Sequence, residues 1–263
     1  MTLQAYDRGV LAVQRRAFVE AREQLELADS DDRALLHLLA PKLRDLTGTD
    51  SQARTMLGVI LAFHLDDPAG GAELLAVSVQ EGDPVAQRTL GYLVQHGIGA
   101  GQDDIRAAEL YQAAAEAGDG VAAFNLGVLS GRSPDAVRWL RVAAEAQVTE
   151  AYPRLGDRLS ERDMDEEALQ WYVRGAEAGD KGSMFAAACW YRDGFGGPIN
   201  LVQALRWYLA MLDVGSGDGI HEAHEIVPRM TVDEIYEAGR LSGRLLEADF
   251  FVQGQAPRSA ASD

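Results

Sequence analysis

The chain has 263 residues, of which 24 are Lys or Arg and 41 are Asp or Glu, so its formal net charge is −17. This charge repels a phosphate backbone, and nucleic acid is therefore not expected as a partner. Hydrophobic residues make up 47% and charged residues 25% of the chain, which is typical of folded proteins and argues against global disorder.

Cysteine usage and the N-terminal residues bear on the compartment. The single cysteine, Cys189, cannot form an internal disulfide, and one thiol cannot build a cysteine-rich zinc site. Residues 1–16 lack the basic start and the long apolar core of a signal peptide. The longest apolar, uncharged run, Thr55–Leu65, is too short to span a bilayer. We therefore expect a cytoplasmic protein with no membrane partner.

Residues 3–46 are the first region predicted to be helical. Apolar residues recur before a polar break at 29–32, and five leucines follow it between residues 35 and 43, with Pro41 as a candidate kink. This region carries none of the repeat marks described below. We interpret residues 1–50 as an N-terminal cap that covers the first repeat or, alternatively, as a partner-binding segment.

Two short sequence marks recur along the centre of the chain. The first is Gly-Asp, and the second, which begins seven residues after the Asp, is Leu-Gly or a degraded copy of it. Gly-Asp occurs at 82–83, 118–119 and 179–180, and the second mark occurs at 57–58, 90–91, 126–127, 155–156 and, as Ala-Ala, at 187–188. From residue 82 on, the step between the two glycine positions is always 9 residues, whereas the connection after Leu-Gly varies from 9 to 16. One fixed and one variable connection are typical of stacked helix pairs, because the turn between pairs must keep its geometry.

The residues between the marks follow helical periodicity. In the second helix of each unit, apolar residues recur at spacings of 0, 3, 4, 7 and 8, for example at Ala107, Leu110, Tyr111, Ala114 and Ala115. One position of this pattern holds three of the four tryptophans: Trp139, Trp171 and Trp207. In the first helix an alanine lies four residues before the Leu: Ala53, Ala86, Ala122 and Ala151. Small residues at these places predict close approach of the helix backbones.

These residues resemble a known repeat. Ala123–Leu129, Asp135–Leu140 and above all Ala168–Asp180 are similar to the Sel-1-like repeat, a relative of the tetratricopeptide repeat, and His96–Gly99 and Asp193–Gly196 resemble its glycine-rich loop. The resemblance covers about residues 52–218 in roughly five units. It implies an all-α fold, a right-handed α-solenoid of about five to six antiparallel helix pairs with N- and C-terminal capping helices. Two units, 119–147 and 148–179, depart from the pattern, since the first lacks the glycine loop and the second keeps only a short polar one.

The C-terminal region is expected to close the array. We place the repeats at 51–218 and a partial repeat with a capping helix at 219–251, in which His221–Val227 is the first helix of an incomplete sixth unit. Thr231–Glu234 has the pattern of a capping box, which predicts a helix to about Asp249. Its buried side is predicted to hold Ile235, Leu241, Leu245 and Leu246. Residues 252–263 are predicted to be a solvated tail.

Candidate chemistry is sparse. His221 and His224 are the only pair of metal-ligand type on one helix, but zinc proteases space these histidines at i and i+4, and no third ligand is evident. The glycine-rich run 97–101 follows a helix rather than a strand and lacks the Lys of a phosphate loop. Cys189 has no nearby His in the sequence and is interpreted as a buried structural thiol. We predict no cofactor, no metal and no enzymatic activity, with a metal-dependent enzyme using His221 and His224 as the remote alternative.

The predicted function is protein binding. In the related tetratricopeptide arrays the first helix of each pair lines the groove, so residues around each Leu-Gly mark are candidates. The candidate contact residues are Arg88, Tyr92, Gln95, Phe124, Val128, Asp157, Phe185 and Arg192. Tyr and Arg are enriched at interface hot spots, whereas the two phenylalanines also fit a packing role.

The resemblance implies a non-enzymatic adaptor or scaffold in a regulatory or signalling complex. The negative charge favours a protein partner with a basic patch, unless that charge only keeps the array soluble. The alternative is a structural or regulatory subunit that acts through its terminal helices or by homo-oligomerisation.

Overall fold

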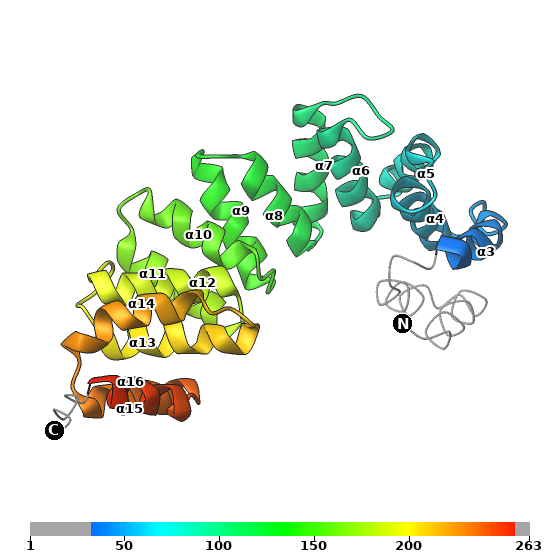
Figure 1. The fold of residues 1–263 in the computed structure, drawn as a ribbon. Helices are drawn as coiled ribbons and strands as arrows, with labels where there is room; N and C mark the ends of the chain where they lie inside the picture. Colours follow the sequence, from blue (N-terminus) through cyan, green and yellow to red (C-terminus); the bar gives the residue numbers. More distant parts are fainter. Residues whose placement is uncertain (1–32, 256–263) are drawn as a thin grey trace, which may run out of the picture. The chain divides into compact units, whose positions relative to one another are not determined.

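The computed structural model describes residues 33–255, which form helices joined by short connections (Figure 1). The first described helix is α3 (Arg33–Arg44). In chain order the helices of the five repeats are α4 (Ser51–Phe63) and α5 (Pro68–Gln80), α6 (Pro84–His96) and α7 (Asp104–Glu116), α8 (Gly120–Leu129) and α9 (Pro134–Glu145), α10 (Ala151–Ser160) and α11 (Asp165–Glu177), and α12 (Lys181–Asp193) and α13 (Leu201–Ala210). The array ends with α14 (Asp218–Ile226), α15 (Val232–Ser242) and α16 (Leu245–Gln255), with short 3₁₀ turns at Met211–Val214 and Val227–Arg229. The all-α solenoid of helix pairs is thus confirmed, and residues 33–255 contain no strand.

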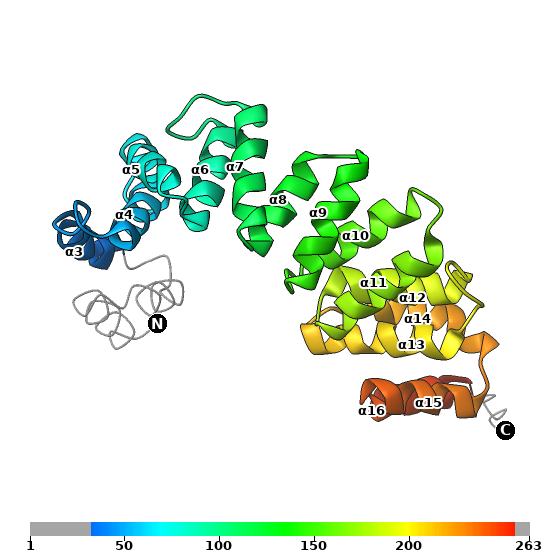
Figure 2. The same ribbon diagram turned by 180° about the vertical axis from the view of Figure 1, so that it is seen from behind.

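The chain divides into two compact units, with the boundary between Leu129 and Ser130. In unit 1 each helix from α3 to α8 packs against the next, and α4 also contacts α6. In unit 2 the same succession runs from α9 to α13, α10 contacts α12, and α15 packs against both α13 and α16. Figure 2 shows both units from behind. We call the first helix of each repeat the A helix and the second the B helix.

The turn from a B helix to the next A helix is built as the Gly-Asp mark predicts. Gly82 adopts a left-handed conformation with φ of 81°, and the carboxylate of Asp83 then accepts hydrogen bonds from the backbone N–H groups of Val85 and Ala86. The copies at 118–119 and 179–180 repeat this geometry. In the repeat that lacks the mark, Gln147 takes the left-handed conformation instead. Every copy of the turn thus has a left-handed residue, and the three Gly-Asp copies add an aspartate cap that the copy before α10 lacks.

The Leu-Gly mark lets the B helix approach the A helix closely. A Cβ atom on Gly91 would lie 2.9 Å from Cε1 of Tyr111, and one on Gly156 would lie 2.5 Å from Cε1 of Tyr172. The ring of the B-helix tyrosine thus lies directly against the A-helix backbone. The alanines four residues before each Leu, Ala53, Ala86, Ala122 and Ala151, are fully buried. This is the close packing that the small residues predict.

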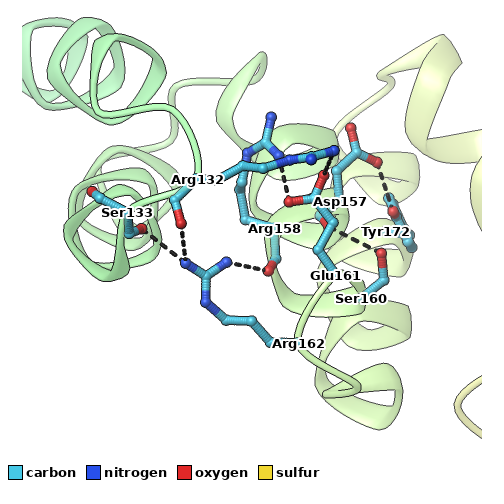
Figure 3. Close-up of polar contacts among 8 residues, drawn as sticks. All are labelled: Arg132, Ser133, Asp157, Arg158, Ser160, Glu161, Arg162 and Tyr172. Atoms are coloured by element: carbon cyan, nitrogen blue, oxygen red, sulfur yellow. Dashed lines mark hydrogen bonds and ion pairs between the residues drawn. The ribbon is translucent and has the colours of Figure 1, made fainter.

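Three of the variable A-to-B loops, those after α6, α10 and α12, contact the preceding repeat. In the long glycine loops, Gly99 lies against the backbone of Pro68 at the start of α5, and Gly196 lies against the backbone of Asp165 at the start of α11. The short loop after α10 has no such glycine. There the guanidinium of Arg162 donates hydrogen bonds to the carbonyl oxygens of Arg132 (2.9 Å) and Ser133 (2.8 Å), just before α9 (Figure 3).

At the N-terminal side α3 packs against α4. Leu39 and Leu43 of α3 are fully buried in a cluster with Leu57 and Ile60 of α4, and Pro41 lies inside α3. The contact supports the interpretation of this end as a cap. The predicted helical residues before Arg33 lie outside the described part, and the assignment of residues 1–50 as a domain stays a prediction.

The C-terminal end differs from the prediction of one helix. The capping box of Thr231 and Glu234 is present, but the helix that it starts ends at Gly243, which has φ of 73°, and α16 follows as a second helix. Because the chain changes direction there, the predicted buried side is wrong: Ile235 is buried, whereas Leu241, Leu245 and Leu246 are 42%, 49% and 85% exposed. Their places in the core are taken by three other residues: Ala238, Ala248 and Phe251. The tail predicted from residue 252 is helical as far as Gln255.

Candidate functional site

The residues considered for metal or phosphate chemistry have structural roles. Residues 33–255 contain no group of three or more His, Cys, Asp or Glu side chains that could hold a metal ion. The His224 ring packs edge-on against Phe251, with centroids 4.9 Å apart. Gly97 is the left-handed C-cap of α6, and Asp103 caps the start of α7. Cys189 is half-buried, and its Sγ atom lies 3.4 Å from the hydroxyl of Tyr208.

In unit 1 two A-helix residues at equivalent positions hold neighbouring repeats together. The hydroxyl of Thr55 donates to the carboxylate of Asp83 at 2.7 Å, and Nε of Arg88 forms an ion pair with the carboxylate of Asp119 at 3.1 Å. Both acceptors are the N-cap residues of the next A helix. The predicted contact residue Arg88 is therefore already engaged within the chain.

Gln95 is also engaged internally. Its side-chain oxygen accepts a hydrogen bond of 2.8 Å from the hydroxyl of Tyr111. Burial, more than any other influence, raises the pKa of Tyr111, so this hydroxyl remains a donor throughout the physiological range. Gln95 thus positions a core tyrosine, and only its remaining amide group is free to face a partner.

Three exposed rings of unit 1 lie side by side. We call Phe63, Tyr92 and His96 the aromatic row. The ring centroids of Phe63 and Tyr92 are 5.8 Å apart, and those of Tyr92 and His96 are 4.2 Å apart. Phe63 is 45% and Tyr92 38% exposed. In the same unit, on α8, Val128 is exposed and Phe124 is half-buried. The row thus offers ring faces on two neighbouring A helices.

The A-helix surface of unit 2 is charged, and two of its charged residues are engaged within the unit. Asp157 accepts a hydrogen bond of 2.7 Å from the hydroxyl of Tyr172 (Figure 3), and Arg192 forms ion pairs with Asp193 and Glu222. Hydrogen bonds from Arg192 hold the pKa of Asp193 below its usual value. Phe185 is the exposed apolar exception, with its ring 6.1 Å from that of Tyr208. Of the three predicted contact residues here, two therefore stabilise the repeats.

The B-helix side of unit 2 carries an open depression of about 690 Å³ lined by residues of α9, α11 and α12. Arg141 of α9 forms an ion pair with Glu167 of α11, and Nε1 of Trp171 donates to the same carboxylate at 3.3 Å. The guanidinium of Arg174 covers the Trp171 ring at 4.7 Å. The ion pair and the hydrogen bond from Trp171 thus connect α9 and α11 across this depression.

Comparison with known families agrees with this geometry. A model of the Sel1 repeat matches residues 84–119, 120–148, 155–180 and 182–216. These four segments correspond to the repeats from α6 to α13. The chain belongs to the Sel1 repeat family. Members of this family commonly serve as protein-interaction scaffolds.

Two solved structures share this fold. A Sel1 repeat protein from Oxalobacter formigenes is similar with a TM-score of 0.58 at 19% identity, over 100% of both chains. The structure of c5321, a protective antigen of uropathogenic Escherichia coli strains with an SLR fold, also has a TM-score of 0.58 at 19% identity and covers 97% of this chain and 68% of its own. These likenesses show the fold. A comparison with curated protein sequences gives no match, and no described helix is long and apolar enough to cross a membrane.

The Sel1 match begins at residue 84, but α4 and α5 are built like the matched repeats. A Cβ atom on Gly58 would lie 2.8 Å from Cγ of Leu75, just as Gly91 meets Tyr111. Asp50 caps α4 by accepting from the backbone N–H groups of Gln52 and Ala53. A fifth repeat of the same geometry thus precedes the four matched ones.

Sequence reasoning missed two members of the aromatic row. Phe63 and His96 each lie six residues after the Leu of their own Leu-Gly mark, at Leu57 and Leu90. The predicted contact residues lie at most five residues beyond that position. The signal was present in the repeat register, because a position one turn beyond a known surface position lies on the same side of a helix.

Proposed function

We propose that this Sel1 repeat protein is a non-enzymatic adaptor that binds a protein partner through the aromatic row of unit 1. The observation that carries the proposal is that three adjacent rings are exposed on two A helices whose polar neighbours, Arg88 and Gln95, are already engaged within the unit. Large aromatic side chains at a surface are typical anchors of protein interfaces. A role in a regulatory or signalling complex and a cytoplasmic location belong to this proposal.

The charge of the repeats in unit 1, residues 51–129, supports a partner with basic residues. Residues 51–129 contain ten Asp or Glu but only three Lys or Arg, at positions 54, 88 and 106. Two of these three, Arg54 and Arg88, are paired with Glu81 and Asp119. A Lys or Arg side chain of the partner would gain both long-range attraction and contact with the ring faces.

The test begins with affinity capture from the native host, using the tagged protein and matched variants. Tyr92→Ser removes the centre of the row, whereas Phe185→Ser removes an A-helix ring of unit 2 that is equally exposed, at 38%. The dissociation constant of the captured partner is then measured by calorimetry at two salt concentrations. We expect Tyr92→Ser to weaken binding about tenfold or more, because hot-spot residues cost at least 1–2 kcal/mol.

Binding through this surface should also weaken as salt is raised, because exposed opposite charges are screened. If Tyr92→Ser and Phe185→Ser weaken the affinity for the partner equally, residues of unit 2 also bind it. Asp157, Phe185 and Arg192 would then contribute. A partner retained at full affinity by Tyr92→Ser, with circular dichroism unchanged, would contradict the proposal. Metal analysis of the purified protein tests the enzyme alternative, since that reading requires an ion at His221 and His224.

A further inference from the structure

The depression of unit 2 that is lined by α9, α11 and α12 contains charged groups without a partner. Of the charged side chains that line it, Arg141 and Glu167 pair with each other. Within residues 33–255, Arg174, Glu145 and Glu166 form no ion pair and no side-chain hydrogen bond. The volume of about 690 Å³ lies in the range of known ligand sites. The depression thus combines a suitable size with unpaired charges of both signs.

Arg174 is positioned by a chain of contacts that begins on the neighbouring repeat. Arg141 of α9 pairs with Glu167 of α11, and Nε1 of Trp171 donates to the same carboxylate at 3.3 Å. The Trp171 ring is buried, and the guanidinium of Arg174 lies on it at 4.7 Å. One face of this guanidinium is therefore held by the ring, while no group of residues 33–255 bonds to its N–H edge. A planar guanidinium fixed in this way suits a carboxylate, which accepts two parallel N–H bonds.

A second donor lines the same depression. Tyr191 of α12 is half-buried, and its hydroxyl has no hydrogen-bond partner in the described part of the chain. A tyrosine hydroxyl that leaves bulk water normally has such a partner. Burial, more than any other influence, raises the pKa of Tyr191, so its hydroxyl keeps the proton and stays a donor at neutral pH. Arg174 and Tyr191 thus give the depression an unpaired cation and an unpaired donor.

The acidic residues of the depression narrow the class of ligand. Glu145 and Glu166 are exposed and line it together with Arg174. They would repel a phosphate or a nucleic acid, which carries several negative charges, and the net charge of −17 adds to this repulsion. A single carboxylate with a basic group beside it complements both signs. The depression is also open, whereas small-molecule sites enclose most of their ligand, so a segment of a partner protein fits it better.

We propose that this depression binds a segment of a partner protein that carries one acidic and one basic side chain. The carboxylate of the segment accepts from the guanidinium of Arg174 and from the hydroxyl of Tyr191. Its Lys or Arg lies beside Glu145 and Glu166. The proposal goes beyond the adaptor function of unit 1 and does not depend on the aromatic row.

NMR spectroscopy of the ¹⁵N-labelled full chain tests the proposal with model peptides. The probes are blocked hexapeptides with one Glu and one Lys, two to four residues apart, and the control probes carry Gln in place of Glu. The indole N–H signal of Trp171 should move on titration, whereas those of Trp139 and Trp207, which do not line the depression, should stay in place. The Gln peptides should bind at least fivefold more weakly, because hydrogen bonds between charged groups are the stronger ones.

Four variants test which side chains make the contact. Arg174→Gln should raise the dissociation constant of the Glu peptides at least tenfold, and Tyr191→Phe at least twofold, because it removes only the hydroxyl. Glu145→Gln should instead lower the dissociation constant of a peptide that keeps Glu and has Ala in place of Lys. Arg138→Gln is the matched control and should bind like the wild type. Arg138 is also exposed and lies over a tryptophan ring, that of Trp139 at 4.6 Å, but it does not line the depression.

A Trp171 signal that stays in place up to about 10 mM peptide would overturn the proposal. Equal affinity for the Glu and Gln peptides would also overturn it, because the carboxylate would then make no contact. So would an equal loss of affinity in Arg138→Gln and Arg174→Gln, because the attraction would then come from the general charge of unit 2. Circular dichroism of each variant excludes misfolding. Failure here leaves the adaptor proposal standing, since its test uses Tyr92.

Discussion

Two loops of unit 2 perform the same task with different chemistry. After α12, the long glycine-rich loop brings Gly196 against the backbone of Asp165 at the start of α11. After α10, the short loop contains no glycine, and the guanidinium of Arg162 reaches back to the carbonyl oxygens of Arg132 and Ser133 before α9 (Figure 3). The first contact is backbone against backbone, and the second is a side chain on two carbonyls. A loop of the array can thus lose its length and its glycines and still contact the preceding repeat.

The two kinds of contact should differ in how they tolerate substitution. A backbone contact depends on the absence of a side chain, so any residue other than glycine is excluded from it. A side-chain contact can be weakened in steps, because each hydrogen bond contributes separately. A third contact between repeats, the ion pair of Arg141 with Glu167, lies partly in solvent and should matter least.

The largest effect is expected for Gly196→Ala. The new Cβ atom would lie 2.4 Å from the carbonyl oxygen of Asp165, and Gly196 has φ of 70°, which an alanine adopts only with strain. Strain of about 1–2 kcal/mol and the clash with rigid backbone together should lower the free energy of unfolding by roughly 2–4 kcal/mol. Urea denaturation followed by circular dichroism measures this loss.

Gly197→Ala is the matched control, because a Cβ atom there would meet nothing within 4 Å. It should change the unfolding free energy by no more than about 0.5 kcal/mol. Equal losses for the two variants would mean that the loop tolerates no side chain at all. The contact with Asp165 would then not be the cause.

Gly156→Ala should come next. The added methyl group would lie 2.5 Å from Cε1 of Tyr172, whose hydroxyl is bound to Asp157, so the ring must shift and the hydrogen bond must lengthen. Overpacking costs about 1–3 kcal/mol, of which the better helix propensity of alanine returns up to about 1 kcal/mol. Tyr172→Leu in the same background should recover part of the loss, because it removes the ring. A double variant that is less stable than the sum of the two single variants would contradict this explanation.

A smaller effect is expected for Arg162→Met. This variant keeps the apolar stem but removes the side-chain donor from the carbonyls of Arg132 and Ser133, of which that of Ser133 still accepts from the backbone N–H of Ala136 at 3.2 Å. The loss should cost about 1–2 kcal/mol. Arg132→Met is the control, because its side chain is 84% exposed and its ion pair with Glu161, at 3.4 Å, should contribute little. Thermal denaturation of the two variants should therefore differ. If both melt alike, the short loop is held by other contacts and the comparison with Gly196 fails.

The sequence predicted the parts of this fold that local chemistry determines. The Gly-Asp turn was readable because a left-handed glycine and an aspartate cap act within a few residues of each other. The role of Arg162 was not readable, because its acceptors are backbone carbonyls about 30 residues away that carry no side-chain signature. The break at Gly243 was missed because the apolar pattern continues across it, and only the cap geometry ends α15 there.

The repeat register predicted which positions lie on the candidate surface, but not which of their side chains are free to contact a partner. Tyr92 and Asp157 lie at equivalent positions, two residues after the Leu of their marks. The first is exposed in the aromatic row, and the second is bound to a core tyrosine. A polar A-helix side chain is free to contact a partner only if no B-helix tyrosine hydroxyl binds it. The sequence of one repeat does not reveal whether the hydroxyl comes close enough.

The smallest effect concerns how stability depends on pH. It tests the ion pair of Arg141 with Glu167. Hydrogen bonding by Arg141 holds the pKa of Glu167 below its usual value, so the folded state binds this proton more weakly than the unfolded state. The resulting stability is present above the pKa of the unfolded chain, near 4.3, and is lost as the pH falls through the lower pKa of the folded state. Because both side chains are about one-third exposed, solvent screening should limit the contribution to under about 1 kcal/mol.

Glu167→Gln should therefore lower the free energy of unfolding slightly at pH 7. Below pH 4 the variant and the wild type should differ less in this free energy. Glu109→Gln, at an exposed position of α7, is the matched control and should change stability at pH 7 by no more than about 0.5 kcal/mol. A wild-type curve that runs parallel to that of Glu167→Gln from pH 7 to pH 3 would show that the ion pair does not connect α9 and α11 energetically, and the contacts between these repeats would then rest on the backbone, Arg162 and the buried side chains.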